Sequence, residues 1–328
     1  MHSLIKRFKR SSEAYLIAVI LLFVVILSFA TPDFLTLNNW VDLIESYSVT
    51  AILAIGLFVV LVTGGIDISF AATASVAQYV AAYAATRLNL PPAVVLVVGL
   101  TVGTLLGFFN AILIDRLRAT AIIITISSMS VYFALLMYFT GGKSIYGLPG
   151  WWSDSMVLFE VATGPDQSAR FTLPILVMLI VAVFTAFIMN RTSLGRQLYA
   201  MGGNPEAARR VGVSLSTMQW FAYGYLGLLA GVAGLLQAHR VGEAVPNAMI
   251  GTGLNVVAAA VLGGASLLGG IGTVSGVVLG IFLLAILRNG LNLLGVSPYF
   301  FQIVIGLILL ASTGITGLSL RRRRVAEA

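Results

Sequence analysis

The stretch RTSLGRQLYAMGGNPEAARRVG, residues 191–212, is a polar interruption in an otherwise strongly apolar part of the chain. LVMLIVAVFTAFIMN precedes it at 176–190, and FAYGYLGLLAGVAGLL follows at 221–236. Hydrophobic residues make up 59% of the chain and charged residues 9%, whereas about 25% of residues are charged in a soluble domain. The composition therefore predicts an all-α protein embedded in a membrane, with the segment 191–215 as a polar surface outside the lipid.

Ten apolar segments follow one another along the chain, and most approach the ~20 residues that a helix needs to cross a bilayer. The first is interpreted as a retained span, because Thr31-Pro32-Asp33 is a poor cleavage site for a signal peptide. We therefore expect a single polytopic domain over residues 1–328. The expected spans are 14–30, 47–62, 68–86, 92–115, 119–140, 172–190, 216–238, 252–265, 271–291 and 299–318.

The basic residues are distributed unevenly among the segments that connect these spans. If the N-terminus lies inside, the inner segments hold 14 of the 19 basic residues and the outer loops hold four, while Arg288 lies near the outer end of a span. Cytoplasmic segments of membrane proteins carry an excess of Lys and Arg. The distribution predicts an even number of spans with both termini in the cytoplasm.

Two four-span blocks, 47–140 and 216–318, share glycines spaced four residues apart in their third spans. These glycines are Gly99, Gly103 and Gly107 in the first block and Gly272, Gly276 and Gly280 in the second. Five spans separate equivalent positions, so the blocks would be inverted in the membrane, as in many transporters. The alternative is that the glycines only allow membrane helices to pack closely.

The sequence TGGIDIS, residues 63–69, joins the second and third expected spans. Gly64 and Gly65 break the helix, and Asp67 then lies where lipid would penalise a charge. One interpretation is a broken helix that lines a polar path. The other is a tight turn in which Asp67 caps the next helix. Both interpretations are compatible.

Glycine-rich turns at 251–255 and 263–270 flank the shortest expected span. Short, glycine-interrupted segments point to a translocation site, although a purely structural re-entrant hairpin is the alternative. Uncharged amides at or near membrane depth suit a neutral, polyhydroxylated substrate, while hydrogen bonding between helices explains each of them singly. These amides belong to Gln78, Asn110, Asn255, Asn289 and Asn292.

Several classes of function lack the residues that they need. Cysteine is absent, and His2 and His239 are far apart, so no metal-ligand cluster is recognisable. Gly142-Lys143-Ser144 is not a phosphate loop, because Met137 stands where the first glycine is required. We find no nucleophile motif and too few carboxylates for a proton relay. We expect no catalysis, bound cofactor, metal or nucleic acid.

The polar stretch 191–212 has the start signal of a short helix, with Asn204 as cap, Pro205 at the first helical position and Glu206 in the first turn. Its charges are of both signs, and glycines stand at its turns. A short helix across the membrane face suits the docking of a moving partner. The alternative is a basic cytoplasmic loop that only sets the topology.

The chain resembles the permease subunits of bacterial simple-sugar ABC importers, the group that handles ribose, xylose, galactofuranose and furanosyl autoinducer. The resemblance extends from about Val49 to Leu310. Four ordered motifs carry it, namely Gly64–Ser69, Arg191–Gly212, Ala258–Gly270 and Asn289–Val296.

The resemblance implies an inner-membrane importer in which two permease chains form a central path. A cytoplasmic ATPase hydrolyses ATP and presses on coupling helices, and a periplasmic sugar-binding protein delivers the substrate. The residues expected to meet the ATPase are Arg191, Leu194, Gly195, Arg196, Asn204, Glu206, Ala207, Ala208 and Gly212. Those expected along the substrate path are Gly64, Gly65, Asp67, Ser69, Gln78, Asn110 and Asn255.

The chain departs from the family pattern at two places near the expected path. Leu254-Asn255-Val256 stands where family members often carry acidic residues, and Phe70-Ala71 stands where they often have Val-Gly. The identity of the sugar and the choice between a homodimer and a pair with a sister permease therefore stay open. The alternatives are a branched-chain amino-acid ABC permease, a stand-alone ion-coupled carrier and a polytopic membrane enzyme.

Overall fold

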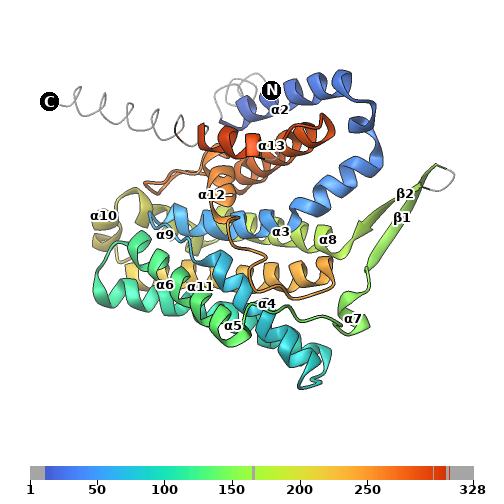
Figure 1. Ribbon diagram of the computed structural model, residues 1–328. Helices are drawn as coiled ribbons and strands as arrows, with labels where there is room; N and C mark the ends of the chain where they lie inside the picture. Colours follow the sequence, from blue (N-terminus) through green and yellow to red (C-terminus); the bar gives the residue numbers. More distant parts are fainter. Residues whose placement is uncertain (1–11, 165–166, 298, 308–309, 311–328) are drawn as a thin grey trace.

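The computed structural model describes residues 12–164, 167–297, 299–307 and 310, and it is mostly helical (Figure 1). Seven of the described helices are long and apolar enough to cross a membrane. They confirm seven of the ten expected spans. These helices are α2 (Ser12–Ala30), α3 (Leu37–Val62), α5 (Pro92–Leu117), α6 (Ala121–Thr140), α8 (Leu173–Arg191), α11 (Leu215–Val241) and α13 (Val274–Leu293).

The other three expected spans are shorter or lie outside the described residues. Helix α4 (Phe70–Thr86) has 17 residues and α12 (Gly253–Leu262) has 10. Helix α12 ends where Gly263 and Gly264 follow it, and Gly264 has a left-handed φ of 87°, which glycine adopts without a steric penalty. Half of the expected span 299–318 lies outside the described residues.

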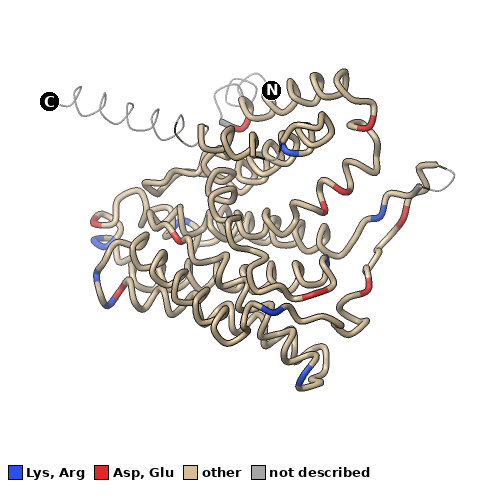
Figure 2. Tube along the Cα trace, viewed as in Figure 1, with Lys and Arg blue, Asp and Glu red and all other residues tan. Residues whose placement is uncertain are grey.

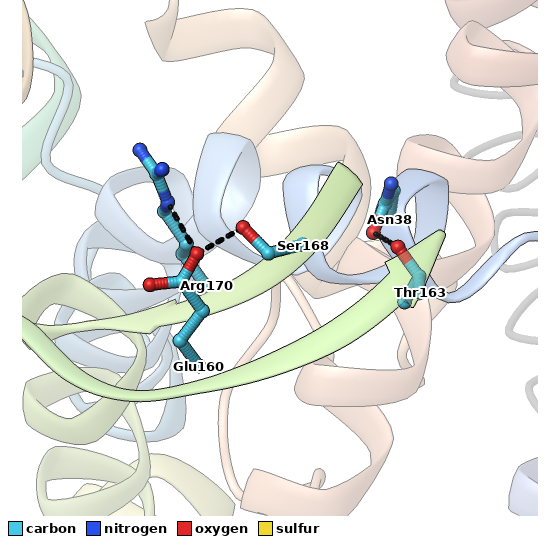
Figure 3. Close-up of polar contacts among 5 residues, drawn as sticks. All are labelled: Asn38, Glu160, Thr163, Ser168 and Arg170. Carbon is cyan, nitrogen blue, oxygen red and sulfur yellow. Dashed lines mark hydrogen bonds and ion pairs between the residues drawn. The ribbon is translucent and has the colours of Figure 1, made fainter. Parts of the chain in front are cut away.

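The expectation of an all-helical chain is wrong at residues 157–172, which form an antiparallel hairpin of β1 (Val157–Gly164) and β2 (Gln167–Thr172). Branched and aromatic residues favour extended backbone here, and the rings of Phe159 and Phe171 stack 4.2 Å apart. Figure 3 shows the hydroxyl of Thr163 donating to Asn38 of α3 over 2.9 Å. The hairpin is thereby tied to the start of α3.

One charged cluster also joins the two strands of the hairpin. The carboxylate of Glu160 accepts hydrogen bonds from the hydroxyl of Ser168 and from Nε of Arg170 (Figure 3). The bond from Ser168, and next the bond from Arg170, lower the pKa of Glu160 below its ordinary value. The ionised form of Glu160 therefore links β1 to β2.

Helices α3 and α11 form the centre of the bundle. Every residue from Ala51 to Val62 on α3 is buried, and most of α11 is buried as well. Large apolar side chains are exposed on α2, α5, α6 and α8, for example Leu22, Leu105 and Phe187. An apolar centre inside an equally apolar outer surface is the arrangement of a bundle that lipid surrounds.

The two expected blocks correspond helix by helix, α3 to α11, α4 to α12 and α5 to α13. When each of these helices is replaced by its counterpart, the pairs of helices that pack together stay the same. Helix α5 packs on α4 and α11, while α13 packs on α12 and α3, and α3 packs on α11. The glycines of the two blocks, however, pack against helices that are not counterparts of each other. A side chain at Gly107 would collide with the carbonyl of Tyr223 on α11, whereas one at Gly280 would collide with that of Ala259 on α12. The glycines therefore serve close packing, as the alternative interpretation had it.

The bundle has two distinct ends. Helices α9 (Ser193–Gly203) and α10 (Pro205–Arg210) lie at one, which we call the α9/α10 end (Figure 1). The hairpin and α7 (Gly150–Ser153) lie at the other, which we call the hairpin end. Charged residues gather toward both ends and are sparse between them (Figure 2). A short 3-10 helix, η1 (Pro32–Leu35), joins α2 to α3.

Candidate functional site

The α9/α10 segment is built by two side-chain caps. Thr192 Oγ1 accepts from the amide of Gly195 over 3.2 Å at the start of α9. Asn204 Oδ1 accepts from the amide of Ala207 over 3.0 Å at the start of α10, with Pro205 next to it. The helix start predicted at Asn204 is thereby confirmed. It could be predicted from the sequence because a cap of this kind depends only on neighbouring residues.

The residues expected to meet the ATPase fall into two groups in the structure. Gly195 and Ala208 are buried and Leu194 is half-buried against the core, so these three support the segment from within. The remaining residues are exposed at the surface of the α9/α10 end. They are Arg191, Arg196, Asn204, Glu206, Ala207 and Gly212.

Three glycine motifs that are far apart in the sequence meet behind this surface, and we call their meeting point the glycine junction: Val62–Gly64, Gly202–Gly203 and Gly269–Gly270. The amide of Gly270 donates to the carbonyl of Val62 over 2.9 Å. A Cβ at Gly202 would collide with that same carbonyl, and one at Gly269 would lie 2.8 Å from the Cα of Gly64. The end of α3, the end of α9 and the 263–273 loop therefore touch through backbone atoms.

Three residues of the expected substrate path form one buried polar network with Tyr132. Asp67 Oδ1 accepts from both the amide and the hydroxyl of Ser69, each over 2.7 Å. Asn110 Nδ2 donates to the hydroxyl of Ser69 over 2.7 Å, and the Tyr132 hydroxyl donates to Asn110 Oδ1 over 3.0 Å. Asp67 is 2% exposed. The network thus joins the α3–α4 connection to α5 and α6, and it is closed to solvent.

The other expected path residues lie in separate places. Gln78 is buried on α4 and donates to the carbonyl of Val245 over 2.6 Å, which ties α4 to the loop after α11. Gly65 lies beside the Tyr223 hydroxyl, and a Cβ there would come within 2.6 Å of it. Gly64 belongs to the glycine junction. Asn255, at the start of α12, lines a cavity at the hairpin end instead.

This cavity has a volume of about 430 Å³ and lies between α3, α12, α13 and the residues Val296, Ser297 and Phe301. Sequence reasoning had singled out the amides of Asn255, Asn289 and Asn292 but not the cavity itself, for which Arg288 in an otherwise apolar span was a usable signal. In the described part of the chain, no three His, Asp or Glu residues lie together as a metal site would need. The polar residues that line the cavity are Asp42, Ser46, Tyr47, Thr50, Arg240, Thr252, Asn255, Arg288, Asn289, Asn292 and Ser297.

Two of the cavity walls are fixed by hydrogen bonds. The side-chain amides of Asn289 on α13 and Asn39 on α3 exchange two hydrogen bonds, of 3.1 and 2.8 Å. Arg240 Nη1, at the end of α11, donates to the carbonyl of Ser46 over 2.7 Å. Arg288 lies over the ring of Phe301, 5.7 Å from its centroid. Among the residues that the structure describes, neither arginine forms an ion pair with a carboxylate.

Span-length apolar helices make this chain an integral membrane protein, and polar groups enclosed between such helices are typical of transport proteins. Residues 39–313 match the family model described as "Branched-chain amino acid transport system / permease component". The chain belongs to this permease family. No solved structure matches it.

Similar curated proteins cover almost the whole chain. The ribose import permease protein RbsC of Haemophilus influenzae is 32% identical over 94% of this chain and 93% of its own length. The galactose/methyl galactoside import permease protein MglC of Escherichia coli is 31% identical over 95% and 96%. The autoinducer 2 import system permease protein LsrC of Yersinia pestis is 32% identical over 94% and 85%.

Proposed function

We propose that this chain is the membrane-spanning subunit of an ATP-driven importer that carries a simple sugar across the bacterial inner membrane. The observation that carries the proposal is the identity of 31% to 33% with ribose and galactose import permeases over nearly the full length of both chains. The substrate is a pentose, a hexose or a related furanose. The subunit translocates it and has no catalytic activity.

The family description names branched-chain amino acids, which was also our main alternative. The named relatives decide against it, because those given above import sugars or the autoinducer. The cavity lining alone does not decide, since Asp42 and Arg288 together offer charges of both signs that a zwitterion would use. An ion-coupled carrier is disfavoured because the exposed α9/α10 segment would have no role in it.

The proposed topology places the α9/α10 end and both termini in the cytoplasm, with the hairpin end facing a periplasmic sugar-binding protein. ATP binds to and is hydrolysed by a separate ATPase subunit that docks on the exposed residues of α9 and α10. A second copy of the chain, or a sister permease, completes the translocation path. The skew of basic residues supports this orientation.

The glycine junction supports a route for the movement of the ATPase. A displacement of α9 would reach the end of α3 and the loop before α13 directly, because their backbones touch at Gly202, Val62 and Gly270. Helix α3 is the centre of the bundle and also forms a wall of the cavity. Nucleotide binding would then shift the population between states that open the path to opposite sides.

ATP-dependent uptake of labelled pentoses, hexoses and furanoses, in cells with and without this gene, tests the proposal. We expect uptake of one neutral sugar to be lost in the deletion strain and restored by the gene on a plasmid. The control for energy coupling is a strain that keeps this gene but lacks a functional gene for the ATPase subunit. Unchanged uptake of every sugar, with loss of an amino acid instead, would falsify the proposal in favour of the main alternative.

A further inference from the structure

Arg288 is a charged residue in the apolar helix α13, and it faces the cavity at the hairpin end. A charge within a membrane span is costly, so such residues face cavities or partners and mark substrate pathways. Within the described residues, the guanidinium group of Arg288 has no carboxylate partner. Its described contacts are the face of the Phe301 ring and the side chain of Tyr47. The helix therefore carries a charge that the core does not use for an ion pair.

The cavity walls offer further hydrogen-bonding groups that the fold leaves unused. In the described part of the chain, the side-chain amides of Asn255 and Asn292 form no hydrogen bond with the protein, whereas Asn289 is engaged with Asn39. Each amide carries two donors and one acceptor. These groups come from α12 and α13, two helices that pack against each other. The site is thus rigidly framed while its inward-facing groups are open to a ligand.

The chemistry of the cavity fits a monosaccharide. Its volume, about 430 Å³, lies in the range of small-molecule sites. The planar guanidinium of Arg288 presents several donors in a fixed fork, which can contact neighbouring hydroxyl groups. Amide groups pair with hydroxyls as donors and as acceptors. The lining carries charges of both signs, Asp42 together with Arg240 and Arg288.

We propose that this cavity is a sugar-binding site within each permease subunit, in which Arg288, Asn255 and Asn292 contact hydroxyl groups of the sugar. Arg288 is the residue that selects among sugars by their hydroxyl pattern. The inference rests on the proposed function and adds a binding site for the substrate inside one chain. The site lies at the hairpin end, on the side opposite the α9/α10 segment.

The first test uses the complete importer, with its ATPase and binding protein, in proteoliposomes. Maximal uptake is measured with the binding protein saturated by the sugar that the wild type imports, and then by its monodeoxy analogues. Losing one hydrogen bond to a charged group corresponds to a fall of about 10-fold. We therefore expect Arg288→Gln to lower uptake of the parent sugar about 10-fold. We also expect it to abolish the discrimination against one deoxy analogue.

The matched control is Arg87→Gln, which makes the same charge change at an exposed residue at the end of α4, outside the cavity lining. It should leave uptake and discrimination unchanged. A merely structural role of Arg288 would lower the uptake of all sugars by the same factor, and that result would overturn the inference.

The second test exploits a chain that contains no cysteine. Asn292→Cys introduces a single thiol into the cavity, and Tyr146→Cys introduces one at an exposed position at the hairpin end. We expect the imported sugar to slow the modification of Asn292→Cys by a charged methanethiosulfonate reagent several-fold, and to leave Tyr146→Cys unaffected. Equal modification rates with and without sugar would overturn the inference even if Arg288→Gln failed to fold.

The two proposals fail in different ways. A wild-type complex that imports no sugar overturns the proposed function, and the sugar site falls with it. A wild-type complex that imports a sugar while Arg288→Gln keeps its full rate and discrimination overturns only the sugar site. Protection of Asn292→Cys by an anionic sugar, but not by the imported neutral one, also contradicts the site as stated.

Discussion

The polar groups at the two ends of the bundle are used in opposite ways. Toward the α9/α10 end, Asp67, Ser69, Asn110 and Tyr132 satisfy one another in a buried network. At the hairpin end, the polar residues around Arg288 border an open cavity. Paired buried groups hold helices in place, whereas groups left without protein partners are available to a ligand. The difference separates the structural polar residues from those suited to binding.

The exchange of the two helix blocks makes this contrast informative about transport. The cavity lies beside the first half of α3 and the second half of α13. The corresponding regions of the other block are the first half of α11 and the second half of α5. There Tyr223 and Asn110 are buried. One arrangement of helices is thus open at one end and closed at the other, as inverted repeats in transporters are expected to be.

The largest effect is expected from Asn110→Leu. It would remove two buried hydrogen bonds, to the hydroxyls of Ser69 and Tyr132, which costs about 2–3 kcal/mol. Ser69 keeps its bond to Asp67, and Tyr132 keeps its bond to the carbonyl of Leu106. Thermal unfolding of the detergent-solubilised protein measures the change. The matched variant Asn292→Leu, in the open cavity, should shift stability by less than about 0.5 kcal/mol, because this side chain is exposed. Equal losses in the two variants would remove the contrast between the ends.

The glycine junction offers a comparison of two adjacent residues. Gly202→Ala places a Cβ against the carbonyl of Val62, whereas a Cβ at Gly203 meets nothing within 4 Å. We expect Gly202→Ala to cost about 1–3 kcal/mol through overpacking and to abolish sugar-stimulated ATP hydrolysis in the complex. Gly203→Ala should keep both properties. If Gly202→Ala hydrolyses ATP with normal stimulation, the junction is not the route of coupling.

A smaller change in stability is expected from Glu206→Lys at the exposed start of α10. The new positive charge opposes the helix dipole, at a cost of about 0.5 kcal/mol, and the core of the bundle is untouched. Stimulation of the ATPase by the sugar-loaded binding protein should nevertheless fall. Normal stimulation in this variant would count against docking at α10.

The smallest effect concerns the hairpin. The pKa of Glu160 is lowered by the bonds from Ser168 and Arg170, so the stabilisation is fully present above the pKa of an unfolded glutamate. It is lost as the pH falls through the lower pKa of the folded state. Hydrogen exchange of the β1 and β2 amides should therefore stay constant from neutral pH down to the ordinary range of a glutamate, once corrected for the intrinsic rate. Below that range, wild-type protection should decrease, and Glu160→Gln should lose this dependence.

The features that sequence reasoning predicted depend on neighbouring residues. Long apolar runs gave the seven spans, and the cap at Asn204 follows from Asn-Pro-Glu. The hairpin at 157–172 was missed because its apolar stretches are short and lie in an expected loop between two spans. Asp67, Ser69 and Asn110 were placed on one path, and the structure brings them together, but in a closed network.

The features that could not be predicted depend on contacts between distant segments. Gly64, Gly202 and Gly269 each belong to a recognisable glycine pair in the sequence, yet nothing local indicates that Gly269 touches the other two. The cavity combines residues from the two halves of the chain, such as Tyr47 and Arg288. Only the packing of α3 against α12 and α13 creates it.

The glycine junction also has a consequence for how solution conditions act on the importer. Its contacts join carbonyl, amide and Cα atoms, and none of these groups titrates or attracts counterions. The exposed surface with Arg196 and Glu206 is charged, so salt screens any partner that binds there. Ionic strength should therefore control how much complex assembles, while the mechanical step inside an assembled complex keeps the same efficiency at any salt concentration.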